Sequence, residues 1–255
     1  MAQEYYAVDI PGKSLYDKDF SVSVRKITPL EQKYILSLAS KEQKTNKDFI
    51  DFIKNIVNIS NPEVHFEDLY WFDVQYLLYR IRFATYAKYP IKLGFICQNR
   101  VPDENDYKLT TICKQEIRHE LKANELKIYT PEDIEDLKTT IVLENFGETK
   151  IRQKIMQDDV TIDELTRKYK LNTDDLQMRL LLLDLCLISK DHSIEELYQA
   201  AMDGTITAED IIAIEDWFSH TIWGVKEEIT IKCPKCGKEE TRSYTLALEE
   251  FFSAI

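Results

Sequence analysis

Residues 232–240, KCPKCGKEE, constrain the fold of this chain more than any other stretch. They place Cys233 and Cys236 in a tight turn between two segments with strand character, ITIK and ETRSYTL. Gly237 allows the chain to reverse there, so that both thiolates face one point. A structural zinc site needs four ligands, and this turn supplies two of them. We therefore expect two further ligands elsewhere in the chain.

Cys97 and Cys113 are the expected partners of this turn, because each ends a strand-like segment, IKLGFIC and YKLTTIC. The competing ligand is His119, six residues after Cys113. The turn could instead carry unligated thiols or a redox pair, although redox pairs more often lie at a helix start in a βαβ unit. Four cysteine ligands would make a closed structural site resembling a zinc ribbon, with iron as the alternative metal.

Charge and cysteine usage narrow the class of protein. The 255-residue chain has a net charge of −12, which repels phosphate backbones, so we expect no nucleic-acid partner. Residues 153–223 hold 15 Asp and Glu against 6 Lys and Arg, a net of −9. Such a segment predicts either solvated helix faces or a docking face for a basic partner. Five cysteines, a start without a signal-peptide pattern and no membrane-length apolar run predict a chain made in a reducing cytoplasm.

The order of sequence patterns along the chain predicts an α+β fold. Capping-box patterns begin at Thr28, Thr161, Ser193 and Thr207. We expect an N-terminal β segment and helical region (1–90), a β-rich region with the first cysteine pair (91–157), an acidic helical insert (158–224), and a C-terminal zinc-knuckle β-hairpin (225–255) that packs on 91–130.

Three polar or sulfur-bearing side chains lie inside segments that read as helix. Residues 66–86 are apolar on more than one side, which predicts a central helix, and residues 47–57 predict another helix. Arg80 and Arg82 interrupt the central helix, and we expect them to extend to the surface or to pair with buried acids. Cys186, in the apolar run LLLLDLCLI, is expected to be a small core residue.

The sequence contains no pattern typical of an active site. No Walker loop, GxGxxG, HExxH or serine-nucleophile signature occurs, and the four histidines are scattered. We therefore expect a chain that is not an enzyme.

The order of motifs resembles the baseplate hub and hub-assembly proteins of contractile-tailed, T-even type bacteriophages. The resemblance runs from VDIPGKSLY (8–16) and FSVSVRKITPLEQKYIL (20–36), through DLYWFDVQYLLYRIRFATY (68–86) and LLLLDLCLISKD (180–191), to WGVKEEITIKCPKCGKEETRSYTLALEEFF (223–252). The chain departs from the family pattern because a 15-residue loop separates Cys97 from Cys113, whereas the family's first pair is usually a tight CxxC.

The resemblance implies a structural or assembly role in the hub of a tail baseplate, without catalysis. Its partners would be other baseplate or tail proteins, with further copies of the chain among them, either during assembly in the host cytoplasm or in the virion. The acidic helical insert would be the docking element. The alternative function is a zinc-ribbon adaptor in a transcription or nucleic-acid complex, although the residues around the turn have mixed charge.

Overall fold

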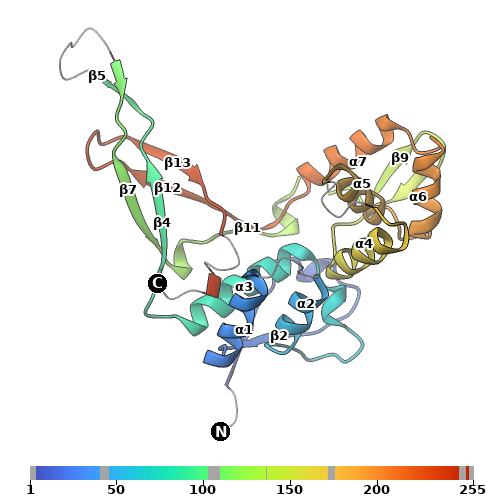
Figure 1. Ribbon diagram of the computed structural model, residues 1–255, viewed down its shortest axis with the longest axis horizontal. Coiled ribbons are helices and arrows are strands. Elements are labelled where there is room, and N and C mark those ends of the chain that lie inside the picture. The colour runs from blue at the N-terminus through green and yellow to red at the C-terminus, as the bar shows by residue number, and fades with distance from the viewer. Residues whose placement is uncertain are drawn as a thin grey trace.

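The computed structural model describes residues 4–40, 46–102, 110–135, 137–171, 176–246 and 251–252. Figure 1 shows three parts: an N-terminal unit at the bottom, a β arm at the left and a helical unit at the right. Helices and small antiparallel sheets are mixed along the chain, as an α+β fold requires. The arm carries the candidate site, and the other two parts carry its surroundings.

The N-terminal unit packs three helices against a three-stranded antiparallel sheet. The sheet has the order β1 (Tyr5–Val8), β2 (Val22–Arg25), β3 (Val57–Ile59), and the helices are α1 (Pro29–Ser40), α2 (Asn46–Lys54) and α3 (Trp71–Thr85). Short 3-10 turns lie at Lys13–Leu15 and Phe66–Asp68. Helix α3 is buried on most of its surface, which confirms the prediction of a central helix. Its apolar side chains therefore organise the core of this unit.

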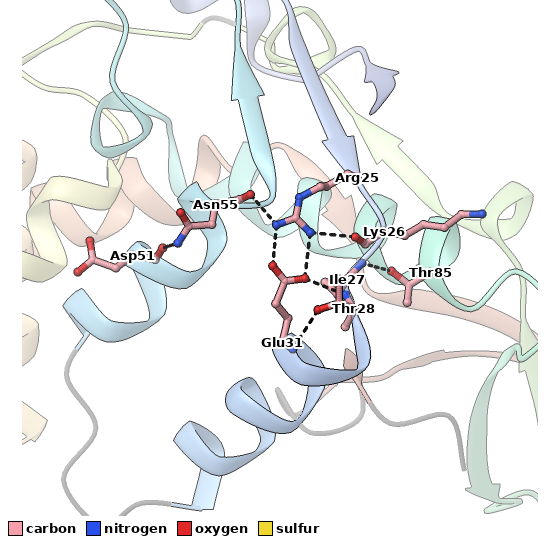
Figure 2. A network of polar contacts seen from close by, with 8 residues as sticks. All are labelled: Arg25, Lys26, Ile27, Thr28, Glu31, Asp51, Asn55 and Thr85. Atoms are coloured by element: carbon pink, nitrogen blue, oxygen red, sulfur yellow. Dashed lines mark hydrogen bonds and ion pairs between the residues drawn. The ribbon is translucent and has the colours of Figure 1, made fainter. Parts of the chain in front are cut away.

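A buried ion pair ties the sheet to the helices of the N-terminal unit (Figure 2). Arg25 donates to both carboxylate oxygens of Glu31, at 2.6 and 2.9 Å, and to the carbonyls of Lys26 and Asn55. Glu31 also accepts from the backbone N–H of Thr28, whose hydroxyl accepts from the Glu31 N–H. The capping box predicted at Thr28 is thus confirmed, and its carboxylate also orients Arg25.

The β arm is built from two-stranded ribbons that face each other. Strand β4 (Ile91–Ile96) pairs with β7 (Glu116–Leu121), and β12 (Glu228–Lys232) pairs with β13 (Glu239–Ser243). Alternate residues are buried along β4, β7 and β12, and they join the core of the N-terminal unit. A short ribbon of β5 (Arg100–Pro102) and β6 (Thr110–Ile112) projects beyond the arm. Period-two burial makes each ribbon apolar on its inner face only.

A narrow ribbon joins the arm to the helical unit. Strand β8 (Lys127–Tyr129) pairs there with β11 (Gly224–Lys226), between short 3-10 turns at Ala123–Glu125 and Pro131–Asp133. Gly224 has φ +90°, and a Cβ atom there would lie 3.1 Å from the Cβ of Phe72. A glycine is therefore needed where β11 passes α3.

The helical unit has a hydrophobic cluster of its own. It contains the hairpin β9 (Thr140–Leu143) and β10 (Gly147–Lys150), then α4 (Met156–Lys168), α5 (Leu176–Leu187), α6 (Ile194–Met202) and α7 (Ala208–His220). Cys186 is 1% exposed within this cluster, as expected of a small core residue. Leu143 and Ile151 also belong to the cluster, whereas the sequence placed the start of the insert at residue 158. The boundaries expected from the sequence stay predictions.

Several local predictions need correction. Helix α4 begins at Met156, so Thr161 lies inside it and donates to the Gln157 carbonyl instead of capping a helix. The N-terminus of α4 is closed by Asp158, which accepts from the Ile155 N–H at 2.9 Å. Helix α2 ends at Lys54, and Val57 already belongs to β3. The boxes at Ser193 and Thr207 are confirmed.

Arg80 and Arg82 are not paired with acids among the described residues. The Arg82 guanidinium lies 4.4 Å from the ring centroid of Tyr86, and the Arg80 guanidinium lies 5.9 Å from that of Tyr76. Aromatic faces therefore take the place of the buried acids that were one of the expected alternatives. No helix among the described residues is both long enough and apolar enough to span a bilayer.

Candidate metal centre

The β arm brings four cysteine side chains to one point. Their sulfur atoms, from Cys97, Cys113, Cys233 and Cys236, all lie within 4.8 Å of one another. Between the two ribbons, the sulfur of Cys97 lies 3.7 Å from that of Cys236, and the sulfur of Cys113 lies 3.8 Å from that of Cys233. A tetrahedral ion with metal–sulfur bonds of about 2.3 Å requires sulfur atoms about 3.8 Å apart. The donor set and these separations fit a tetrahedral metal ion.

The two cysteine pairs occupy equivalent places in two similar turns. In the C-terminal turn, the Cys233 N–H donates to the Lys238 carbonyl and the Gly237 N–H donates to the Cys233 carbonyl. In the other turn, the Cys97 N–H donates to the Gln115 carbonyl and the Lys114 N–H donates to the Cys97 carbonyl. Cys97 therefore corresponds to Cys233, and Cys113 corresponds to Cys236.

Backbone dihedral angles show the same correspondence. Gly237 follows Cys236 with φ +73°, and Lys114 follows Cys113 with φ +54°. Left-handed backbone is common for glycine and costs a residue with a Cβ about 1 kcal/mol or more. Lys114 thus takes the position that glycine holds in the C-terminal turn. The first turn therefore has the backbone geometry of the C-terminal turn, with the β5–β6 ribbon inserted between its two cysteines, which accounts for their separation in the sequence.

Backbone N–H groups point at the sulfur atoms. The N–H groups of Asn99, Gln115 and Lys238 hydrogen-bond the sulfurs of Cys97, Cys113 and Cys236, in each case two residues before the donor. The Asn99 side-chain amide also donates to the Cys236 sulfur at 3.6 Å, and the Lys238 ammonium donates to the Asn99 side-chain oxygen Oδ1 at 3.0 Å. Donors of this kind stabilise thiolates and orient metal ligands.

The thiols differ in acidity because their surroundings differ. The Lys238 N–H and the Asn99 amide lower the pKa of Cys236 to about 6. The Asn99 N–H lowers the pKa of Cys97, but burial and the neighbouring sulfurs outweigh it and raise the pKa to about 12. A thiolate at Cys236 near neutral pH is a suitable first ligand, because a metal ion binds thiolates and displaces protons from the thiols that join it.

His119, the competing ligand, does not belong to the cysteine group. It lies on β7 opposite Leu93, and its Nε2 is 3.3 Å from a carboxylate oxygen of Glu125. Sequence reasoning missed Asn99, Lys114 and Lys238, which shape and charge the site. Their position two residues, or one residue, after a cysteine is the signal that could have found them.

Comparison with known proteins agrees with the resemblance inferred from the motifs. A family model described as T4 bacteriophage base plate protein matches residues 8–253, which include both cysteine pairs and the helical unit. The chain has no match among the curated proteins, and none among the solved structures. The match covers nearly the whole length of the chain, so it does not depend on a single motif. The chain belongs to the T4 bacteriophage base plate protein family.

Proposed function

We propose that the chain is a non-enzymatic structural or assembly component of the central hub of a contractile phage-tail baseplate. The family match over residues 8–253 is the observation that carries this proposal. The chain would be assembled in the host cytoplasm and would act through contacts with other baseplate or tail proteins. A structural role is in line with a site of four cysteine sulfurs, which leaves a tetrahedral ion no open position for a substrate.

The proposed task of Cys97, Cys113, Cys233 and Cys236 is to hold one zinc ion. Two-stranded ribbons are at best marginally stable alone, because each has only one face to bury. A four-thiolate zinc site contributes on the order of 10 kcal/mol, which would fasten the two ribbons of the arm to each other. The ion would thereby also hold the two chain segments on either side of the helical unit at a fixed separation.

The proposed docking element is the acidic helical unit. The side chains of three of its exposed acids have no hydrogen bond or ion pair among the described residues, namely Glu164, Glu209 and Glu215. Their charges are therefore available to a basic neighbour in the baseplate.

Affinity purification from infected cells tests the proposal. A tagged chain should recover baseplate or tail proteins, identified by mass spectrometry, and its detection in purified particles would make it a permanent subunit. A triple change to Lys at Glu164, Glu209 and Glu215 should abolish this recovery. The matched control carries the same change in charge at three exposed acids elsewhere, Asp9, Glu120 and Glu135. Recovery of polymerase subunits, or of no tail protein, would contradict the proposed function.

A further inference from the structure

An apolar groove lies between α3 and the sheet of the N-terminal unit. It has a volume of about 340 Å³. On the sheet side, Val8 and Val24 are buried in its floor, and Tyr6 stands opposite Val24 in the register of β1 and β2. On the helix side, Phe83 and Ala84 lie three and four residues after Arg80, so these three side chains share one face of α3. The small side chain of Ala84, with those of Ala87 and Ala123, leaves the space open.

The groove carries two cations and no acid. Lys26 lies 5.6 Å from the ring centroid of Tyr6, and Arg80 lies over Tyr76. Neither cation has an ion pair with an acid in the part of the chain that the structure describes. An apolar floor with a cationic rim fits an apolar side chain that is flanked by acids.

Helix α7 presents such a side chain. Ile212 is 62% exposed. Glu209, Glu215 and Asp216 stand at −3, +3 and +4 from it, so they surround it on the surface of the helix, and all three are exposed. Asp216 lies 3.5 Å from His220, and the two glutamates have no ion pair among the described residues. We call Ile212 with these three acids the acidic knob.

The knob and the groove of one chain are far apart. Phe218, near the C-terminal end of α7, stacks on Phe72 at the N-terminal end of α3, with ring centroids 6.2 Å apart. Ile212 lies toward the other end of α7, while the groove lies along the C-terminal half of α3. Figure 1 shows α7 at the upper edge of the helical unit and α3 in the N-terminal unit below. A contact between knob and groove must therefore join two chains.

We infer that the acidic knob on α7 of one chain docks into the cationic groove between α3 and the β1–β2 sheet of a second copy. The two surfaces carry opposite charges. The apolar side chain of the knob also complements the apolar floor of the groove. Because knob and groove are different surfaces, the contact is either heterologous, building a ring or a row of copies, or made twice about a two-fold axis.

The inference rests on the docking role proposed above for the helical unit, and it names one partner of that unit. Its test needs the purified full-length chain alone, so it can fail while the recovery of baseplate proteins from infected cells succeeds. Conversely, the purified chain can self-associate even where no baseplate protein is recovered from infected cells.

Sedimentation velocity of the purified chain measures the self-association directly, over about 1 to about 100 µM, the range of weak protein contacts. We expect association that weakens as salt is raised. Ile212→Arg, the knob variant, and Lys26→Glu, the groove variant, should each weaken it by about tenfold or more. Arg80→Glu is a second groove variant. Leu30→Arg and Lys92→Glu are the matched controls, at exposed positions outside both surfaces, and they should associate as the native chain does.

Mixing the variants tests the pairing itself. One copy of Ile212→Arg keeps its groove, and one copy of Lys26→Glu keeps its knob. A mixture of the two should therefore form a dimer that neither forms alone. A native chain that stays monomeric at about 100 µM, variants that associate like the native chain, or a mixture that stays monomeric would each overturn the inference.

Discussion

The buried carboxylate of Asp73 should make the stability of the protein depend on pH in a direction opposite to that of a salt-bridged acid. Asp73 is on α3 and is completely inaccessible to solvent. It accepts from the Gly12 N–H and from the Tyr16 hydroxyl, both at 2.7 Å, and so anchors the loop after β1 to the central helix. Burial raises its pKa from 3.8 to about 6, although its hydrogen-bond donors partly oppose the shift.

The size of the effect follows from the shift in pKa. A difference of about two pKa units between the folded and unfolded chains corresponds to about 3 kcal/mol. Between pH 4 and pH 6 the folded chain holds the proton more tightly than the unfolded chain does. The contribution of Asp73 to the free energy of unfolding should therefore be greatest at and below about pH 4, and it should fall by about 3 kcal/mol as the pH rises past the folded pKa.

Urea unfolding of the native chain and of Asp73→Asn, at matched metal content between about pH 4 and about pH 7, isolates this contribution. The amide cannot ionise, so the difference in unfolding free energy between the two proteins should change by about 3 kcal/mol across the range. Other titrating groups are common to both proteins and cancel. Asp19→Asn is the control, because the Asp19 side chain is 97% exposed. If the difference in unfolding free energy between the two proteins stays constant with pH, the raised pKa of the buried Asp73 carboxylate is refuted.

Three further predictions concern the N-terminal unit and the two cysteine turns. Arg25→Met should cost about 2 to 4 kcal/mol in urea unfolding, because it leaves a half-buried Glu31 and two carbonyls without their hydrogen-bond donor. Arg82→Met should instead be neutral or stabilising, because burial lowers the pKa of Arg82 and no acid among the described residues compensates its charge. The Arg25 guanidinium lowers the pKa of Glu31 to about 2. The stability that this pair contributes should therefore be present above about pH 4.5 and be lost as the pH falls toward 2. Glu31→Gln should remove that loss from acid unfolding curves. In thermal unfolding, Gly237→Ala should lower the stability by about 1 to 2 kcal/mol because Gly237 has φ +73°. Lys114→Gly should not lower the stability, because glycine adopts the left-handed backbone of this position more readily than lysine. Equal losses of stability in the two variants would refute the equivalence of the two turns.

The meeting of the four cysteines could be expected from the sequence because strand-like segments end at Cys97 and Cys113 and border Cys233. A thiolate at a strand end is placed by the register of the strand, and register follows from period-two burial. The sequence did not reveal that the two turns are equivalent. A glycine at position 114 would have indicated left-handed backbone, but the residue there is lysine. The inserted β5–β6 ribbon also replaces the short CxxC spacing that would have identified the first turn. Metal binding itself stays a prediction.

Local errors came from motifs whose context only the tertiary structure supplies. The TIDE pattern at Thr161 has the residues of a capping box, but Asp158 already closes the helix one turn earlier. Val57 continues the apolar periodicity of α2, yet it pairs with Val24 and lengthens the sheet. The partner of Arg82 could not be predicted either. A tyrosine four residues later in the helix can contact the guanidinium as readily as an acid can, and the sequence pattern does not distinguish the two.

The central claim is that the two turns bind one metal ion through four cysteine sulfurs, and X-ray absorption at the metal edge tests it most directly. Protein purified without added metal should contain about one equivalent of zinc or iron per chain, with four sulfur neighbours at about 2.3 Å and no nitrogen or oxygen neighbour. Cys113→Ser should lose the ion or replace one sulfur, while Cys186→Ser, at the buried cysteine outside the site, should keep the spectrum of the native chain. A chain that folds with its ribbons intact and binds no metal, or one whose ion has a histidine neighbour, would contradict the account.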